Sequence, residues 1–216
     1  YGWPRMTTYL HACGYPVNHK RVQRLLRKMG LIAIYPKPRT TFNNPEHRVY
    51  PYRLRGLAVT KPNQVWCADI TYIRLAGGFM YLVAIMDWFS RYILTWELSN
   101  TLDGHFCLSA LREALGYEQP VIFNTDQVVQ FTATAFTTTL EQANVLISMD
   151  GRGRALDNIF IERFWRTLKY EDIYLKEYAD VPGLYDGLTR YMQFYNHERR
   201  HQSLKNCTPA QVYFGR

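Results

Sequence analysis

The sequence predicts an α/β protein in which a mixed sheet flanked by helices follows a small helix-turn-helix and a basic linker. Three observations support this fold class. Residues 64–216 alternate strand-forming with helix-forming segments. Residues 35–63 contain five prolines and little periodicity. Residues 1–34 contain two short helical segments joined by a turn. We therefore divide the 216-residue chain into a helix-turn-helix segment, a proline-rich linker and a larger core.

Charge is distributed unevenly along the chain. Residues 1–61 hold 12 basic side chains and one acid, a net of +11, whereas the other 155 residues hold 14 basic and 17 acidic groups, a net of −3. A basic arm on a body of different charge is typical of a protein that binds a polyanion. We expect the arm to contact nucleic acid; a solvated basic tail is the alternative interpretation.

The basic arm contains the predicted helix-turn-helix. One helical segment covers residues 5–13, and Asn18 is placed to cap a second helix that runs to Met29 and stops at Gly30. Apolar residues of the second helix fall on one face at helical spacing. The side chains expected to bind DNA are Lys20, Arg21, Arg24, Arg27 and Lys28. A helical hairpin with a solvated basic face would show the same pattern.

In the core, three segments rich in strand formers have short connections, which predicts an antiparallel meander. These segments are QVWCADITYIRL, FMYLVAIMDWFS and RYILTWELS. The elements expected after the meander are a helix from Asp103 to about Leu115, the buried strand PVIFNTD, a helix near 133–143, the strand VLISM, a long helix from Asn158 and a last helix over about 182–195. Strands and helices in this order predict a mixed sheet covered by helices.

Three acids of the core occupy positions suited to metal chemistry. Asp69 lies in the middle of a predicted strand, where an unpaired carboxylate is costly to bury. Asp126 follows the end of a strand, and Glu162 lies on an amphipathic helix. Two strands and a helix can thus supply the hard oxygen ligands that a pair of Mg²⁺ ions needs. Each acid taken alone would more often be a solvated surface residue.

The spacing along the chain strengthens the metal interpretation. Between Asp126 and Glu162 lie 35 residues, and Lys169 follows Glu162 by two helical turns, where it can reach a phosphate. The predicted polar face of this helix consists of Asn158, Glu162, Arg166 and Lys169. A second candidate site, a zinc site at His197 and His201, lacks acidic or thiol partners at supporting spacing, so packing or phosphate contact is the favoured interpretation there.

Taken together, these residues resemble the integrase-like DD(35)E insertion-sequence transposases, whose catalytic core is related to retroviral integrase. The matching motifs are WCADITYI around Asp69, NTDQ around Asp126, DNIFIERFWRTLKYE around Glu162 and YNHERRHQSL from Tyr195. Residues 1–40 resemble the helix-turn-helix segment that precedes the core in these enzymes. The resemblance covers essentially the whole chain.

The resemblance implies an RNase-H-like fold and a catalytic, metal-binding triad of Asp69, Asp126 and Glu162, with two Mg²⁺ (or Mn²⁺) ions. It implies that Lys169 contacts DNA, and we extend this expectation to Arg166 and Asn158. The implied activity is metal-dependent strand cleavage and strand transfer, on terminal inverted repeats and target DNA, by a homo-oligomer. Two alternatives remain: an impaired transposase remnant that only binds DNA, and an RNase-H-like nuclease.

The chain departs from the family pattern at two places. Val128-Val129 stand where the family usually has Gly-Ser, and Arg200 replaces the usual Pro before His201. A β-branched residue forced to positive φ after Asp126 would be strained, so we expect impaired activity. The alternative is that the valines take negative φ and leave Asp126 in place.

Composition excludes two further classes of protein. The longest apolar stretch, Phe79 to Met86, is far shorter than the ~18 residues that span a membrane. The four cysteines form no CxxC pair and are expected to be reduced thiols, at Cys13, Cys67, Cys107 and Cys207. We expect a cytoplasmic, nucleoid-associated protein. The chain starts at Tyr1 rather than Met, so it is expected to be part of a longer protein.

Overall fold

The computed structural model describes residues 2–31, 50–150 and 158–215. The chain forms two compact units, Tyr1–Asn44 and Pro45–Arg216. Residues 151–157, which precede the helix expected from Asn158, and residues 35–49 of the predicted linker lie outside the described residues. The described residues contain no helix that is both long and apolar enough to cross a membrane.

The first unit contains two helices, α1 (Trp3–Ala12) and α2 (His19–Lys28). The side-chain oxygen of Asn18 accepts a hydrogen bond from the Lys20 backbone N–H at 2.8 Å, so the predicted cap is confirmed. After α2 the chain turns at Gly30, whose φ of +68° favours glycine. Two short helices joined by a turn form, as the sequence predicted, and α2 has the expected side-chain cap.

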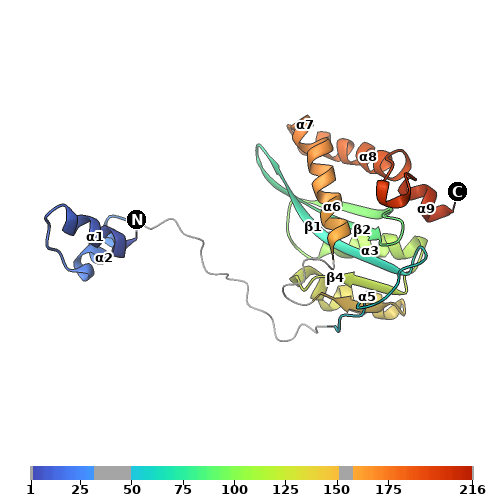
Figure 1. Cartoon of the computed structure of the whole chain (residues 1–216), viewed down its shortest axis with the longest axis horizontal. Coiled ribbons are helices and arrows are strands. Elements are labelled where there is room, and N and C mark those ends of the chain that lie inside the picture. The colour runs from blue at the N-terminus through green and yellow to red at the C-terminus, as the bar shows by residue number, and fades with distance from the viewer. Residues whose placement is uncertain (1, 32–49, 151–157, 216) are drawn as a thin grey trace. The chain divides into compact units, whose positions relative to one another are not determined.

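The second unit is built on a five-stranded mixed sheet in the order β3-β2-β1-β4-β5 (Figure 1). The strands are β1 (Val65–Leu75), β2 (Gly78–Asp87), β3 (Ile93–Ser99), β4 (Ile122–Thr125) and β5 (Leu146–Met149). β1, β2 and β3 pair antiparallel, which confirms the predicted meander, whereas β4 pairs parallel to both β1 and β5. Because β1 joins the two halves, it lies at the centre of the sheet.

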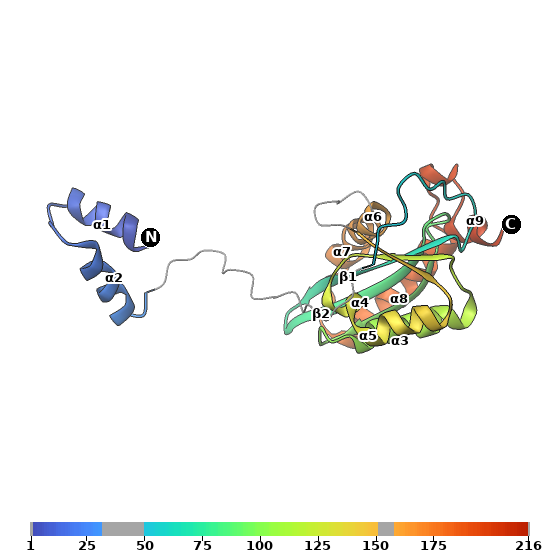
Figure 2. The ribbon, with the colours of Figure 1, turned by 90° about the horizontal axis from the view of Figure 1, so that it is seen from below.

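Helices cover both faces of this sheet. The helices are α3 (His105–Tyr117), α4 (Val129–Thr132), α5 (Thr134–Gln142), α6 (Ile159–Leu168), α7 (Tyr174–Lys176), α8 (Val181–His197) and α9 (Pro209–Phe214), with a π-helical turn at Lys169–Ile173 and a 3₁₀ turn at Gln202–Leu204. Figure 2 shows α3 and α5 on one side of β1 and β2, with α6 on the other. The helix predicted over 182–195 is α8, which begins one residue earlier and ends two residues later.

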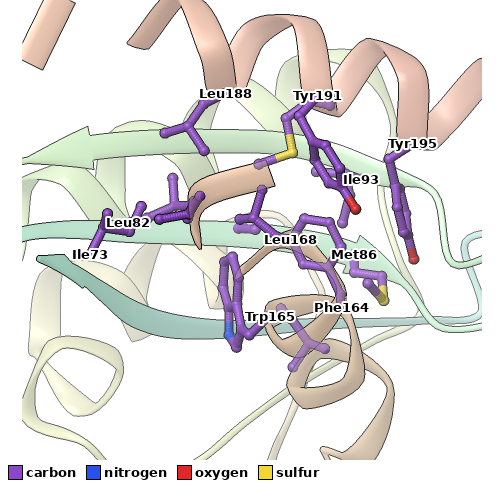
Figure 3. Close-up of a cluster of buried hydrophobic side chains, with 14 of the residues drawn as sticks. Ile73, Leu82, Met86, Ile93, Phe164, Trp165, Leu168, Leu188, Tyr191 and Tyr195 are labelled. Atoms are coloured by element: carbon purple, nitrogen blue, oxygen red, sulfur yellow. The ribbon is translucent and has the colours of Figure 1, made fainter. Parts of the chain in front are cut away.

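The alternation of side chains along β1 decides which helices each residue meets. Trp66 and Ala68 pack into a cluster with α3 and α5, whereas Cys67 and Ile73 pack into a cluster with α6 and α8. Figure 3 shows the second cluster, in which α6 and α8 place large side chains against the strands. Asp69 shares its face with Cys67 and Ile73, so it points towards α6.

Residues 50–63 are the described part of the predicted linker, and they lie against the core. Leu54 is buried against Val65 and Ile122. The backbone N–H of Arg53 donates to the Ser148 hydroxyl at 3.0 Å. These contacts add an irregular segment to the half of the sheet formed by β1, β4 and β5. The domain boundaries at residues 34 and 63 stay predictions.

Candidate active site

Pairing between β1 and β4 places the first two predicted catalytic acids side by side. Cys67 pairs with Asn124 across the parallel ladder. Two residues further along each strand stand Asp69 and Asp126, the latter just beyond the end of β4. Parallel strands present their carboxyl ends at the same edge, where α/β sheets place functional groups. The strand positions inferred from the sequence therefore place the carboxylates of Asp69 and Asp126 next to each other.

Helix α6 brings the third acid to the same region. The indole Nε1–H of Trp165 donates a hydrogen bond to Asp69 Oδ2 at 2.9 Å, which ties α6 to the middle of β1. Glu162 is exposed and lies one turn before Trp165 on α6. The apolar stripe that seats the helix is buried as predicted and consists of Ile161, Phe164, Trp165 and Leu168.

Electrostatics show that the three acids interact. Burial is the largest cause that raises the pKa of Asp69 to about 7, and the charges of Asp126 and Glu162 contribute to this rise. Hydrogen bonds from the Ile70 backbone and from Trp165 oppose this rise. Burial also raises the pKa of Asp126, against a hydrogen bond from the Val128 N–H. Asp69 therefore lies in a region of concentrated negative charge that a cation would relieve.

The carboxylates do not form a closed cage in this arrangement. Within residues 2–31, 50–150 and 158–215, no group of three or more His, Cys, Asp or Glu side chains is assembled closely enough to hold a metal ion. The donor chemistry nevertheless fits a hard divalent cation, since the set consists of oxygen ligands and includes a half-buried carboxylate beside two like charges. Asp69, Asp126 and Glu162 are the residues that could hold it.

The predicted polar face of α6 is only partly exposed. Lys169 begins the π-helical turn, interacts electrostatically with Asp69, and its Nζ lies 5.0 Å from the centroid of the Tyr72 ring. Burial lowers the pKa of Lys169, and the charge of Asp69 opposes that shift. Arg166 is exposed, whereas Asn158 is only 7% exposed, so the expectation that Asn158 shares the exposed face is wrong. Asn158 is the N-cap residue of α6, although its side chain makes no capping hydrogen bond.

The five basic residues predicted to bind DNA in the first unit are all exposed on α2. They are Lys20, Arg21, Arg24, Arg27 and Lys28. Val22 is the buried residue of α2, and the basic side chains of this helix face solvent. This placement is compatible with a DNA contact, which stays a prediction.

Val128 and Val129 are not strained. Val128 has φ −70° and ψ 152°, and Val129 begins α4; neither is among the described residues with positive φ. The expectation of backbone strain is therefore wrong, because the residue that follows β4 and Asp126-Gln127, Val128, is extended rather than left-handed. The Val128 N–H also donates to Asp126 Oδ1 at 3.3 Å, so the first valine supports the carboxylate.

Sequence reasoning missed a set of buried polar contacts beside Asp126. The side-chain amide of Asn124 donates to Asp150 Oδ1 at 3.0 Å, and that of Gln127 donates to the Asp150 carbonyl oxygen at 2.9 Å. These bonds tie the end of β4 to the end of β5. The available signal was Asn124 itself, because an amide inside a buried strand requires a partner. The indole of Trp165 was a similar signal, because the N–H of a buried indole also needs a hydrogen-bond acceptor.

Three family models match parts of this chain. Family models described as "Integrase core domain" match residues 59–155 and 143–209, and one described as "HTH-like domain" matches residues 1–39. The helix-turn-helix prediction is thereby confirmed.

Two curated relatives are similar over almost the whole chain. The putative transposase InsK for insertion sequence element IS150 of Escherichia coli (strain K12) is 32% identical over 98% of this chain and 76% of its own length. The transposase for insertion sequence element IS904 of Lactococcus lactis is 31% identical over 97% of this chain and 85% of its own length.

Among solved structures, the HTLV-2 integrase catalytic core domain in complex with magnesium has a similar fold. It matches with a TM-score of 0.58 and 18% identity, over 71% of this chain and 97% of that one. The predicted fold class, an RNase-H-like mixed sheet flanked by helices, is confirmed.

Proposed function

This chain belongs to the family of integrase-like insertion-sequence transposases, and we propose that Asp69, Asp126 and Glu162 are its catalytic metal ligands. It is a DNA transposase, and thus a polynucleotidyl transferase. The finer proposal is that it cuts and joins strands at the terminal inverted repeats of its own element. Two Mg²⁺ (or Mn²⁺) ions are the proposed cofactors, and the related HTLV-2 core was solved with magnesium.

One observation carries the assignment: Asp69 is a largely buried carboxylate whose pKa is raised to about 7 by burial and by two neighbouring carboxylates. Neighbouring like charges are costly unless a cation compensates them. Structural acids are normally paired with Lys or Arg instead, as Glu171 is with Arg199. Lys169 interacts electrostatically with Asp69 but forms no salt bridge with it among the described residues, which favours a metal ion as the partner of this carboxylate.

Each residue of the site has a distinct proposed task. Asp69 and Asp126 present carboxylate oxygens from the sheet, and Glu162 presents one from α6. Trp165 fixes the orientation of Asp69 through its indole N–H. Lys169 lies on the same side of α6 and is placed to hold a DNA phosphate. When bound, divalent ions supply activation of the attacking oxygen and stabilisation of the leaving oxygen.

The proposed partners follow from the same assignment. The exposed basic residues of α2 bind the element's terminal repeats, and the catalytic unit also accepts target DNA. Strand transfer at two ends requires more than one copy of the chain, and the HTLV-2 core was described in a dimeric form. We place the protein on nucleoid DNA in the cytoplasm. The strain that would have favoured an inactive remnant is absent at Val128.

The test is a joining assay on a labelled element end with Mg²⁺. The substitutions Asp69→Asn, Asp126→Asn and Glu162→Gln should each lower cleavage and joining by at least about 10³-fold, because each removes an anionic oxygen ligand. DNA binding should change little. Glu113→Gln, an exposed acid on α3, is the matched control.

Three results are informative in this assay. Near-normal turnover in any one triad variant refutes the role of that residue. Cutting without joining by the unaltered chain would indicate a nuclease, and binding without chemistry would indicate a remnant.

A further inference from the structure

A basic cavity of about 530 Å³ lies on the second unit beside α6, and Asp69 is not among the described residues that line it. Helix α6 contributes Arg163 and Thr167, and the turn between β2 and β3 contributes Arg91. The segment after α8 closes the cavity with Arg199, Arg200 and Ser203. We name this cavity the arginine pocket, after Arg91, Arg163, Arg199 and Arg200. It brings together guanidinium groups from three distant parts of the sequence.

Arg91 is held at one wall of the pocket. Its guanidinium carbon lies 3.3 Å from the centroid of the Phe160 ring, a stacked geometry that Arg favours. Its backbone has φ +64° and donates to the Asp87 carbonyl oxygen at 2.9 Å. The Asp87 carboxylate accepts bonds from Ser90 and Asn63, so it is already occupied. Burial lowers the pKa of Arg91, and the charge of Asp87 is among the influences that oppose this shift.

Two further arginines are positioned by contacts of their own. Arg199 donates to both carboxylate oxygens of Glu171, at 2.8 and 2.6 Å. Arg200 donates to the Asn206 carbonyl oxygen at 3.0 Å. A guanidinium has five N–H donors, so these bonds orient each group and leave donors for a ligand. Arg200 is also one of the residues that depart from the family pattern.

The pocket has an excess of positive charge. Of its four arginines, Arg199 is the one with an ion pair among the described residues, to Glu171. The lining residues that the structure describes include no acid. His201 adds no charge near pH 7, since burial and the charges of Arg199 and Arg91 lower its pKa to about 4. The hydroxyls of Thr167 and Ser203 add neutral donors.

We propose that the arginine pocket binds a phosphate group of the DNA backbone. A tetrahedral oxyanion matches several guanidinium forks flanked by hydroxyls. DNA is the favoured source because the chain is a transposase, and the inference rests on that function but not on the triad. Arg163 directly follows Glu162, roughly 100° further around α6. A strand held in the pocket would therefore lie on a side of α6 different from that of the Glu162–Lys169 face.

The test compares two double variants that remove the same charge. Arg163→Gln with Arg200→Gln removes two exposed pocket arginines, and Arg112→Gln with Arg190→Gln removes two exposed arginines elsewhere. The probe is a labelled duplex of arbitrary sequence, because phosphate contacts carry no base information. Binding is measured with the full chain in EDTA over a range of salt concentrations, so that neither metal nor the triad is needed.

The pocket variant should bind about tenfold more weakly, with a slope of log K against log salt reduced by ~0.9 for each lost phosphate contact. The control variant should match the unaltered chain. Exchange of the same two pocket residues for lysine should keep most of the salt slope, and thermal unfolding should show that all variants fold.

Two results would overturn the proposal. Equal loss in the pocket and control variants would mean that general charge, not the pocket, holds the DNA. An unchanged salt slope in the pocket variant, with inorganic pyrophosphate raising the melting temperature of the unaltered chain but not of that variant, would assign the pocket to a free phosphate compound. Failure of the triad assay would leave this measurement unaffected.

Discussion

The two units of the chain differ in what they offer to DNA: the first offers exposed positive charge, and the second offers carboxylates held on a hydrophobic core. Residues 2–31 of the first unit hold six basic and no acidic side chains, and Val22 is the one buried residue among them. The second unit buries a hydrophobic cluster on each face of its sheet, and it places its proposed catalytic acids at the edge of that core. Exposed charge on a short frame is sufficient for contact with a polyanion. Keeping a carboxylate partly buried beside other carboxylates costs free energy, and a large hydrophobic core is needed to offset that cost.

The difference extends to what stabilises each unit. Burying one aliphatic side chain contributes about 1.5–3 kcal/mol, which is small beside a backbone entropy cost of roughly 1–2 kcal/mol per ordered residue. The first unit therefore depends on local devices such as the Asn18 cap and Pro4 in the first turn of α1. The second unit depends on long-range packing, such as that of α6 and α8 on the sheet (Figure 3).

The largest expected effect tests this contrast in packing. Phe164 is 1% exposed, and its ring centroid lies 4.8 Å from that of Tyr195. Phe164→Ala should lower the free energy of unfolding of the second unit by about 3–5 kcal/mol, because it leaves a cavity between α6 and α8. Val22→Ala, the matched change in the first unit, should not move the main thermal transition. A shift of that transition by Val22→Ala would show that the two units unfold together.

Removing residues 1–34 tests the division of tasks. Affinity for element ends should fall by about 100-fold and its dependence on salt should flatten, because fewer counterions are released. The main thermal transition should stay in place, since the core lies in Pro45–Arg216. The measurement is a DNA titration at several salt concentrations with parallel thermal unfolding. If the shortened chain distinguishes element ends as well as the full chain does, α2 does not read them.

The third prediction concerns the cost of the carboxylates. The pKa of Asp69 rises from 3.8 to about 7 on folding, so ionised Asp69 destabilises the folded state. This cost grows as the pH rises from about 4 to 7 and is complete above that. In EDTA, Asp69→Asn should therefore raise the free energy of unfolding by at least about 1 kcal/mol near pH 8 and much less near pH 5.

Thermal unfolding at the two pH values measures this gain, and Asp186→Asn on the exposed face of α8 is the control. If the free energy of unfolding rises equally at both pH values, the stabilisation by Asp69→Asn does not come from removing the charge of Asp69.

The smallest effect is expected at the valines after Asp126. Because Val128 already has negative φ and donates its N–H to Asp126, glycine is not required there. Val128→Gly combined with Val129→Ser should change the rate of strand transfer by less than about threefold, measured in the joining assay. A tenfold gain would show that the valines impair the site by some route other than backbone strain.

Several features of the molecule were determined by the sequence alone. The Asn18 cap, the meander and the apolar stripe of α6 depend on neighbouring residues or on a short repeat, so local physics is enough to predict them. The resemblance in motif spacing identified the three acids. These signals predicted the fold class and the candidate triad.

Other features were decided by the tertiary structure. Trp165 and Asp69 are 96 residues apart and Asn124 and Asp150 are 26 apart, so nothing in either local segment names the partner. The conformation of Val128 depended on α4 starting at the next residue, rather than on valine itself. The arginine pocket joins three segments that only the packing of α6 and α8 on the sheet brings together. Burial and charge act through space, and the sequence records distance only along the chain.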